Sequence, residues 1–130
     1  MRHFTVDEAN ALLPMLTQVL EDMQGLGRRM REAVEAVHTF EHRAVQNGHS
    51  PRRVPFEREH DLSAIRTEME QRLEYLHAIG VHLKDIENGI LDFPTRMHGH
   101  DVYLCWRLGE ERIAYWHEIE GGFAGRRPLI

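Results

Sequence analysis

Histidine is the residue type in this sequence with the widest chemical use, and it accounts for ten of the 130 residues. Imidazole nitrogens bind transition-metal ions and change charge near neutral pH. His98 and His100 flank a glycine in a predicted turn, and His117 lies in a later predicted strand. In the register given below, His100 and His117 are diagonal neighbours on one sheet face, near the distance at which two imidazoles share a zinc ion.

These three histidines are therefore the candidate ligands of zinc or another transition-metal ion, with water or His3 as a further ligand. The alternative is a surface turn that contains two histidines. His38 and His42 form a separate pair, four residues apart with Glu41 between them. That spacing suits metal chelation on a helix, but it lacks the HExxH order of a metalloprotease. The alternative for this pair is a solvated helix face.

Cys105 is the one cysteine, so the chain cannot form an internal disulfide, and this fits a reducing compartment. As a nucleophile, Cys105 would need a base within hydrogen-bond reach. The predicted register places Asp92 beside Cys105 and His117 on the opposite face of the sheet. A cysteine–histidine pair is therefore not expected, and Cys105 is interpreted as a small apolar filler.

One predicted sheet face combines charged, aromatic and thiol side chains. Aromatic area and arginine together suit a polar ligand, because arginine binds carboxylates and phosphates with two hydrogen bonds. The face is a candidate protein interface or small-ligand site, and Arg107, Arg112 and Arg126 would hold a small anion. The alternative is a half-solvated face, or one that the glycine-rich tail covers with Arg126 and Arg127. The candidate binding residues are Asp92, Tyr103, Cys105, Arg107, Arg112, Trp116, Glu118 and Arg126.

Two helices are predicted in the first 80 residues. Thr5 and Glu8 form a capping box, and apolar residues then recur every three or four positions as far as Ala44. Pro14 predicts a kink, or a short helix before the long one. The first helix is expected to end at Asn47-Gly48, and residues 48–59 form a loop. A second helix begins near His60 or Asp61 and stops at Gly80.

After Gly80 the apolar pattern changes from helical to alternating. Strands are predicted at 81–85, 90–95, 101–107 and 112–118, with two-residue turns at His98-Gly99 and Gly109-Glu110. The first turn pairs Phe93 with Leu104, and the second pairs Cys105 with Ala114. Both registers then place one apolar set on a single face: Leu91, Phe93, Val102, Leu104, Trp106, Ile113, Tyr115 and His117.

These elements predict an α+β fold, in which a long antiparallel helical hairpin packs on a small three- to four-stranded antiparallel sheet. The second helix is about half as long as the first and covers only residues 27–46 of it. We therefore expect the sheet to cover the stripe over residues 12–26. The chain is interpreted as one domain, 1–130, with the hairpin at 1–80, the sheet at 81–120 and a glycine-rich tail at 121–130.

Composition excludes several classes of protein. Lys and Arg number 16 against 21 Asp and Glu, and a net charge of −5 argues against binding to duplex nucleic acid. No apolar run approaches the roughly 18 residues of a membrane helix, and the first residues do not resemble a signal peptide. A cytoplasmic protein is therefore expected.

Several strings of the sequence point to one family. They are Phe4–Pro14 (FTVDEANALLP), Lys84-Asp85, Gly89–Pro94 (GILDFP), Val102–Glu110 (VYLCWRLGE), Tyr115–Glu118 (YWHE) and Gly122–Leu129 (GFAGRRPL). In combination they resemble an uncharacterised bacterial family, domain of unknown function 2203, along the whole chain. The family brings no established activity, so the resemblance implies no site residues.

The leading functional hypothesis is a non-enzymatic cytoplasmic binding or adaptor protein that uses the polar sheet face and the tail. A homodimer through the helices is expected as well, because the first helix carries more apolar stripe than the second can cover. The competing hypothesis is a metal-binding protein with His98, His100 and His117 as ligands. A metal-dependent hydrolase is its enzymatic version, although no general base has been placed beside those histidines.

Overall fold

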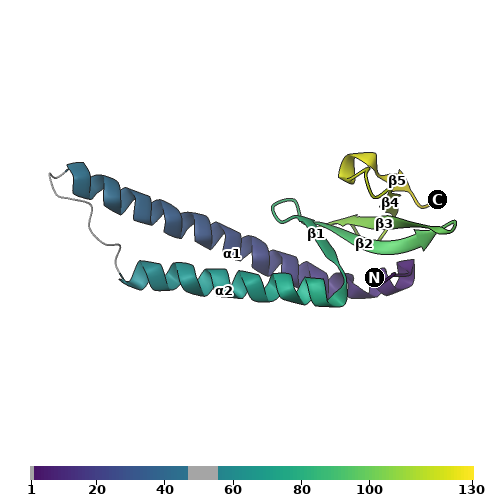
Figure 1. Ribbon diagram of the computed structural model, residues 1–130, viewed down its shortest axis with the longest axis horizontal. Helices are drawn as coiled ribbons and strands as arrows, with labels where there is room; N and C mark the ends of the chain where they lie inside the picture. The colour runs from purple at the N-terminus through teal and green to yellow at the C-terminus, as the bar shows by residue number, and fades with distance from the viewer. Residues whose placement is uncertain (1, 47–55) are drawn as a thin grey trace.

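The computed structural model describes residues 2–46 and 56–130, which form a helical hairpin and a small antiparallel sheet (Figure 1). Helix α1 spans Val6–Gln46 and helix α2 spans Phe56–Ile79. The five strands follow in chain order, and each pairs antiparallel with the next. They are β1 (His82–Asp85), β2 (Ile90–Met97), β3 (His100–Arg107), β4 (Tyr115–His117) and β5 (Arg127–Pro128). The predicted α+β class is confirmed.

The start of α1 follows the predicted capping box. The backbone N–H of Thr5 donates to Oε1 of Glu8 at 3.0 Å, and that of Glu8 donates to Oγ1 of Thr5 at 3.0 Å. The predicted separate first helix does not form, because α1 continues through Pro14. Leu13 and Leu16 are buried on either side of the exposed proline. Their packing outweighs the hydrogen bond that proline removes from the helix.

The limits of α2 differ in part from the prediction. The helix begins at Phe56, four residues before His60, so the predicted loop 48–59 is wrong over its last four residues. The predicted end of the first helix at Asn47-Gly48 and the rest of that loop lie outside the described residues. Gly80 ends α2 as predicted, with a φ of 86° that suits glycine.

The tail contributes a strand that the sequence did not predict. A short 3₁₀ turn at Phe123–Gly125 precedes β5, which pairs with β4 through Tyr115↔Pro128 and Trp116↔Arg127. Gly122 permits the bend before this turn, since its φ is 61°. The tail therefore folds back on the sheet, and Figure 1 shows it above β3 and β4.

The predicted register is correct for one hairpin and wrong for the other. Strands β2 and β3 pair as expected, for example Phe93↔Leu104 and Asp92↔Cys105. Strand β3 pairs with β4 through Cys105↔Tyr115, whereas the prediction paired Cys105 with Ala114. The connection is longer than a two-residue turn, and the strand begins only at Tyr115. A shift of one residue moves every β4 side chain to the other face.

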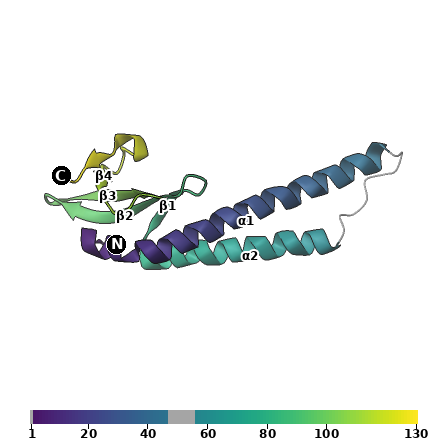
Figure 2. The same cartoon turned by 180° about the vertical axis from the view of Figure 1, so that it is seen from behind.

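The sheet covers the first half of α1, as expected. The prediction that the second helix covers only residues 27–46 is wrong, because Arg72 of α2 pairs with Asp22 at 3.8 Å and Leu76 joins the core cluster. Leu13, Leu16, Leu20 and Met23 of α1 share one buried cluster with apolar residues of the sheet. These are Leu91, Phe93, Leu104, Trp106 and Ile113. Figure 2 shows the same arrangement from behind, with the far half of α1 accompanied only by α2. Within the described residues, no helix has the length and apolar character needed to cross a membrane.

Candidate metal centre

Three side chains with metal-binding atoms meet on the face of the sheet that points away from α1. Asp92 comes from β2, Cys105 lies opposite it on β3, and His117 comes from β4. A carboxylate oxygen, the thiol sulfur and an imidazole nitrogen all lie within 4.8 Å of one another. The exposed fractions of the three residues are 1%, 0% and 1%. We call these residues the triad.

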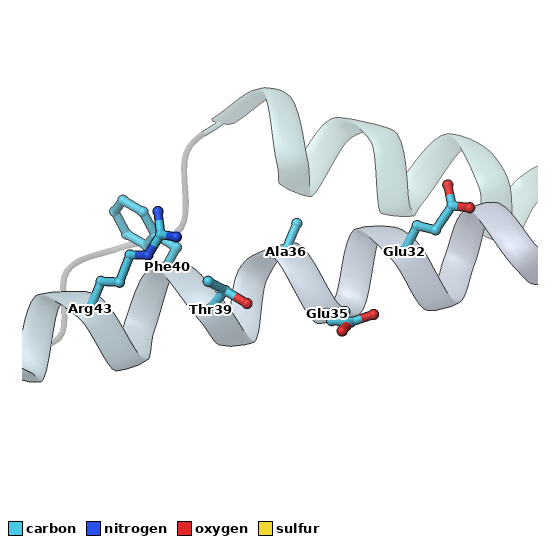
Figure 3. Close-up of a pocket in the computed structure, with 6 residues that line it drawn as sticks. All are labelled: Glu32, Glu35, Ala36, Thr39, Phe40 and Arg43. Carbon is cyan, nitrogen blue, oxygen red and sulfur yellow. The ribbon is translucent and has the colours of Figure 1, made fainter.

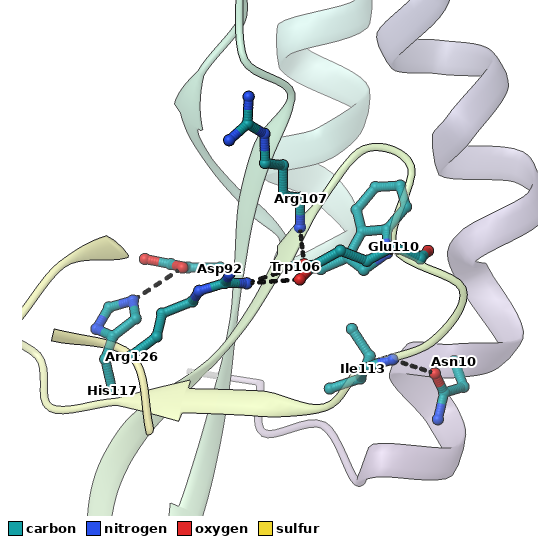
Figure 4. A network of polar contacts seen from close by, with 8 residues as sticks. All are labelled: Asn10, Asp92, Trp106, Arg107, Glu110, Ile113, His117 and Arg126. Carbon is teal, nitrogen blue, oxygen red and sulfur yellow. Dashed lines mark hydrogen bonds and ion pairs between the residues drawn. The ribbon is translucent and has the colours of Figure 1, made fainter. Parts of the chain in front are cut away.

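The imidazole of His117 is held at both nitrogens. Its Nδ1 lies 2.6 Å from the backbone oxygen of Glu118, and its Nε2 lies 3.0 Å from Oδ1 of Asp92 (Figure 4). Since a carbonyl oxygen only accepts, Nδ1 carries a hydrogen and donates it. The other ring nitrogen, Nε2, faces the carboxylate of Asp92. Because the hydrogen on Nδ1 is already used, the hydrogen bond between Nε2 and Asp92 needs one further proton, which these two side chains share.

The thiol of Cys105 is kept protonated by its surroundings. Burial, together with the charge of the Asp92 carboxylate and the hydrogen bond that it accepts from the thiol, raises the pKa of this thiol to about 12. A thiol with this pKa is a poor nucleophile at neutral pH. Cys105 is therefore not activated for covalent catalysis in this state.

An ion pair of the tail lies beside the triad. Nη1 of Arg126 is 2.9 Å from both carboxylate oxygens of Glu110, and these side chains are 17% and 25% exposed. The Arg126 guanidinium also stacks on the rings of Tyr115 and Phe123, each at 4.1 Å. Tyr115 lies opposite Cys105 across β3 and β4, which places this pair close to the triad. We call the Arg126–Glu110 pair the latch.

The loop between β3 and β4 positions Glu110 for this contact. The backbone N–H of Arg107 donates to Oε1 of Glu110 at 2.6 Å, and Nε1 of Trp106 donates to the Glu110 backbone oxygen at 2.9 Å. Further along the loop, the N–H of Ile113 donates to Oδ1 of Asn10 at 2.7 Å. Figure 4 shows how these contacts anchor the loop to the sheet and to α1.

The structure separates the histidines that the sequence grouped. His117 was predicted to share a face with the apolar core, but it lies opposite that face, in the triad. His100 is exposed and pairs with Glu118 at 3.5 Å, while His98 is exposed in the turn with a φ of 52°. His3 pairs with Asp101 at 3.0 Å. Among the described residues, the triad is the only group of three potential ligands, so His98 and His100 do not join His117.

The candidate residues of the predicted polar sheet face do not form one surface in the structure. Asp92 and Cys105 are buried in the triad, and the ring of Tyr103 packs 5.5 Å from that of His117. Trp116 was predicted on this face, but it packs against the core on the opposite side. Arg107, Arg112 and Glu118 are exposed, and Arg126 folds over the face as expected of the tail. His38 and His42 stay exposed on α1.

The prediction that no histidine lies near Cys105 was therefore wrong. The error has one source, the assumed two-residue turn at Gly109-Glu110. A signal for the longer loop was present in the sequence. That signal is the apolar residue Ile113, two residues before Tyr115. In the structure Ile113 belongs to the loop and its side chain is buried in the core, while β4 begins only at Tyr115.

Comparison with known proteins places the chain in a family without assigning it an activity. No curated protein and no solved structure matches it. A family model described as "Uncharacterized conserved protein (DUF2203)" matches residues 2–129, nearly the whole chain, as the resemblance in the sequence implied. On this match, the chain belongs to the DUF2203 family.

Proposed function

We propose that this protein binds a transition-metal ion, with zinc as the best fit, through Asp92, Cys105 and His117. The observation that carries the proposal is the convergence of three different ligand atoms within 4.8 Å at a buried point of the sheet. Thiolate, imidazole and carboxylate are the three side-chain ligands that zinc uses. Ligands about 2.0–2.3 Å from a tetrahedral zinc lie roughly 3.3–3.7 Å apart, so a small contraction of the triad would suffice.

Charge balance supports a divalent ion. With Cys105 as thiolate, Asp92 as carboxylate and His117 neutral, the triad carries two negative charges. Buried charges need compensation, and two protons now supply it, one on the thiol and one shared by Asp92 and His117. A divalent cation replaces both protons and leaves the site neutral. Metal binding to such ligands releases protons in this way.

The orientation of His117 also supports the proposal. Metal-binding histidines usually donate their second N–H to a carbonyl or carboxylate, which fixes the ring and its tautomer. The Nδ1–H of His117 has this contact with the Glu118 carbonyl, and its Nε2 faces Asp92. Three protein ligands would leave the fourth zinc position to water. We propose binding without hydrolysis, since the nearby Glu110 carboxylate is engaged by Arg126 and is not available as a base.

Elemental analysis of untagged protein, loaded with zinc and then dialysed, tests this function. The expected result is stoichiometric zinc in the wild type, with strong loss in Cys105→Ser and His117→Ala. His98→Ala and His100→Ala are the matched controls and should retain the metal. Since substitutions in the triad could disturb folding, circular dichroism must show native helix content in each variant. Equal zinc in the wild type and in folded Cys105→Ser would exclude the triad.

A second candidate function is self-association through the helical hairpin. Apolar side chains are exposed on it, with Val34 at 53%, Phe40 at 37%, Leu73 at 40% and Tyr75 at 45%. Phe40 also lines a hollow on the far half of α1, together with Glu32, Glu35, Ala36, Thr39 and Arg43 (Figure 3). A second copy of α1, laid antiparallel there, would bring Arg43 opposite the two glutamates.

Analytical ultracentrifugation over a range of concentrations tests the dimer. Phe40→Glu should shift the equilibrium toward monomer. Ile119→Glu should not, since it changes an apolar residue that is still more exposed, at 53%, and that follows β4 instead of lying on the helices. A wild type that stays monomeric at every concentration would contradict this candidate.

An adaptor role through the polar sheet face would have to use its exposed residues, Arg107, Arg112 and Glu118, because Asp92 and Cys105 are buried.

A further inference from the structure

A groove runs between the start of α1 and the end of the tail. Its first hollow has apolar walls from Val6, Ile113, Tyr115 and Leu129. A second hollow shares Val6 and Leu129 and extends the groove to Phe4, Met97 and Leu104. We call the two together the N-terminal groove. Its length and apolar middle suit a chain-like ligand better than a compact one.

The two ends of the groove differ in charge. Arg112 lines the first hollow, is exposed, and forms no ion pair within residues 2–46 and 56–130. At the other end, Arg96 is already neutralised by Asp101 at 3.3 Å. An anionic group would therefore settle at Arg112. The side-chain amide of Asn10 also lines this hollow.

Hydrogen bonds hold the walls of the groove in place. The Oδ1 atom of Asn10 accepts from the N–H of Ile113 at 2.7 Å, and the N–H of Leu129 donates to Ala114 at 3.0 Å. On the other side, the N–H of Phe4 donates to the Pro94 oxygen at 2.7 Å. A groove fixed in this way needs little ordering when a ligand binds, which favours affinity.

We propose that the N-terminal groove binds a medium-chain fatty carboxylate. The carboxylate contacts the guanidinium of Arg112, and the alkyl chain lies along Val6 and Leu129 toward Met97. Arginine suits this contact because its planar donors match the two carboxylate oxygens. None of the triad residues lines the groove, and the variants that test the two proposals differ, so the two proposals stand or fall separately.

The test is a titration of ¹⁵N-labelled protein with sodium decanoate, below the concentration at which it forms micelles. Saturable shifts are expected for the amides of Val6, Ile113 and Leu129. Arg112→Gln should weaken decanoate binding at least about tenfold, since it removes the two charge-assisted hydrogen bonds to the carboxylate and the loss of one already has an effect of that size. Arg66→Gln removes an exposed arginine of α2 and is the matched control, with unchanged affinity.

Decanol separates the role of charge from that of the alkyl chain. It should bind more weakly than decanoate to the wild type, and equally to the wild type and Arg112→Gln. Leu129→Asp, which places a charge in the apolar wall, should abolish both. Absence of saturable shifts at these amides would overturn the proposal. The same holds if decanoate binds Arg112→Gln as tightly as the wild type.

Discussion

Nε2 of His117 and Oδ1 of Asp92 lie 3.0 Å apart, in side chains that are 1% and 2% exposed. The two residues are 25 positions apart in the chain and come from strands that do not pair with each other. Strand β3 lies between them and adds the thiol of Cys105 to the same point. A polar cluster of this kind is costly to bury unless every group has a partner.

Loss of the latch should destabilise the protein. Arg126→Ala removes a largely buried ion pair with two short hydrogen bonds and two ring contacts. The expected decrease in the free energy of unfolding is about 1.5–3 kcal/mol, measured by urea denaturation. Arg127→Ala is the control, since the neighbouring Arg127 side chain is exposed and lies 5.3 Å from the Trp116 ring. Equal losses in both variants would show that the latch contributes nothing specific.

Because the sheet packs on α1, alanine substitutions at two leucines should lower the free energy of unfolding by different amounts. Leu16 is completely buried beneath the sheet, and Leu73 on α2 is 40% exposed. Leu16→Ala should lower the free energy of unfolding by about 2–5 kcal/mol, because it leaves a cavity in the core. Leu73→Ala should cost clearly less. Urea denaturation of both variants checks this order, and a reversal would contradict the placement of the sheet.

The capping box predicts a pH-dependent contribution to stability. Hydrogen bonds from the backbone and hydroxyl of Thr5 lower the pKa of Glu8 below its ordinary value, and Arg2 adds to this. A lowered pKa in the folded state means that the stabilisation is present above the ordinary pKa of glutamate. It is lost as the pH falls through the lowered pKa of Glu8.

Glu8→Ala should therefore lower the melting temperature at pH 7, and the difference from the wild type should shrink in acid. Calorimetry at several pH values measures this. Glu21→Ala, at an exposed position of the same helix, is the control and should show no such trend. A Glu8→Ala difference that stays constant with pH would contradict a role for the Glu8 charge.

Cys105 should resist thiol reagents until the protein opens. Its side chain is 0% exposed, so alkylation in the native state requires local or global unfolding. Arg126→Ala should speed the reaction, because it loosens the tail beside the triad. A Glu120→Cys variant in a Cys105→Ala background supplies an exposed thiol for comparison. Equally fast reaction of native Cys105 would show that the triad is open to solvent.

Much of the fold follows from periodic patterns in the sequence. The stripe from Leu13 to Met23 predicts the face of α1 that the sheet covers, and the short β2–β3 turn fixes its register through alternating apolar residues. Each of these two predictions rests on a pattern in which many apolar residues have the same spacing. A single unusual residue, such as Pro14, does not overturn such a pattern.

The candidate site depended on one loop length, which the sequence alone did not determine. Two-residue turns are the commonest hairpin connections, but here residues 108–114 connect β3 to β4. The resulting shift moves His117 from the core face to Cys105. Strand β5 was missed for a related reason, because its two residues pair only after Gly122 turns the chain back.

Cobalt substitution tests the central proposal, metal binding by the triad, most directly. Co²⁺ adopts zinc sites, and a thiolate ligand gives it a charge-transfer absorption band in the near ultraviolet. Titration of the wild type with Co²⁺ should produce this band and saturate at one ion per chain. Cys105→Ser should lose the band, while His100→Ala should keep it. A wild type that shows no thiolate band, or a band that survives in Cys105→Ser, would contradict metal binding by Asp92, Cys105 and His117.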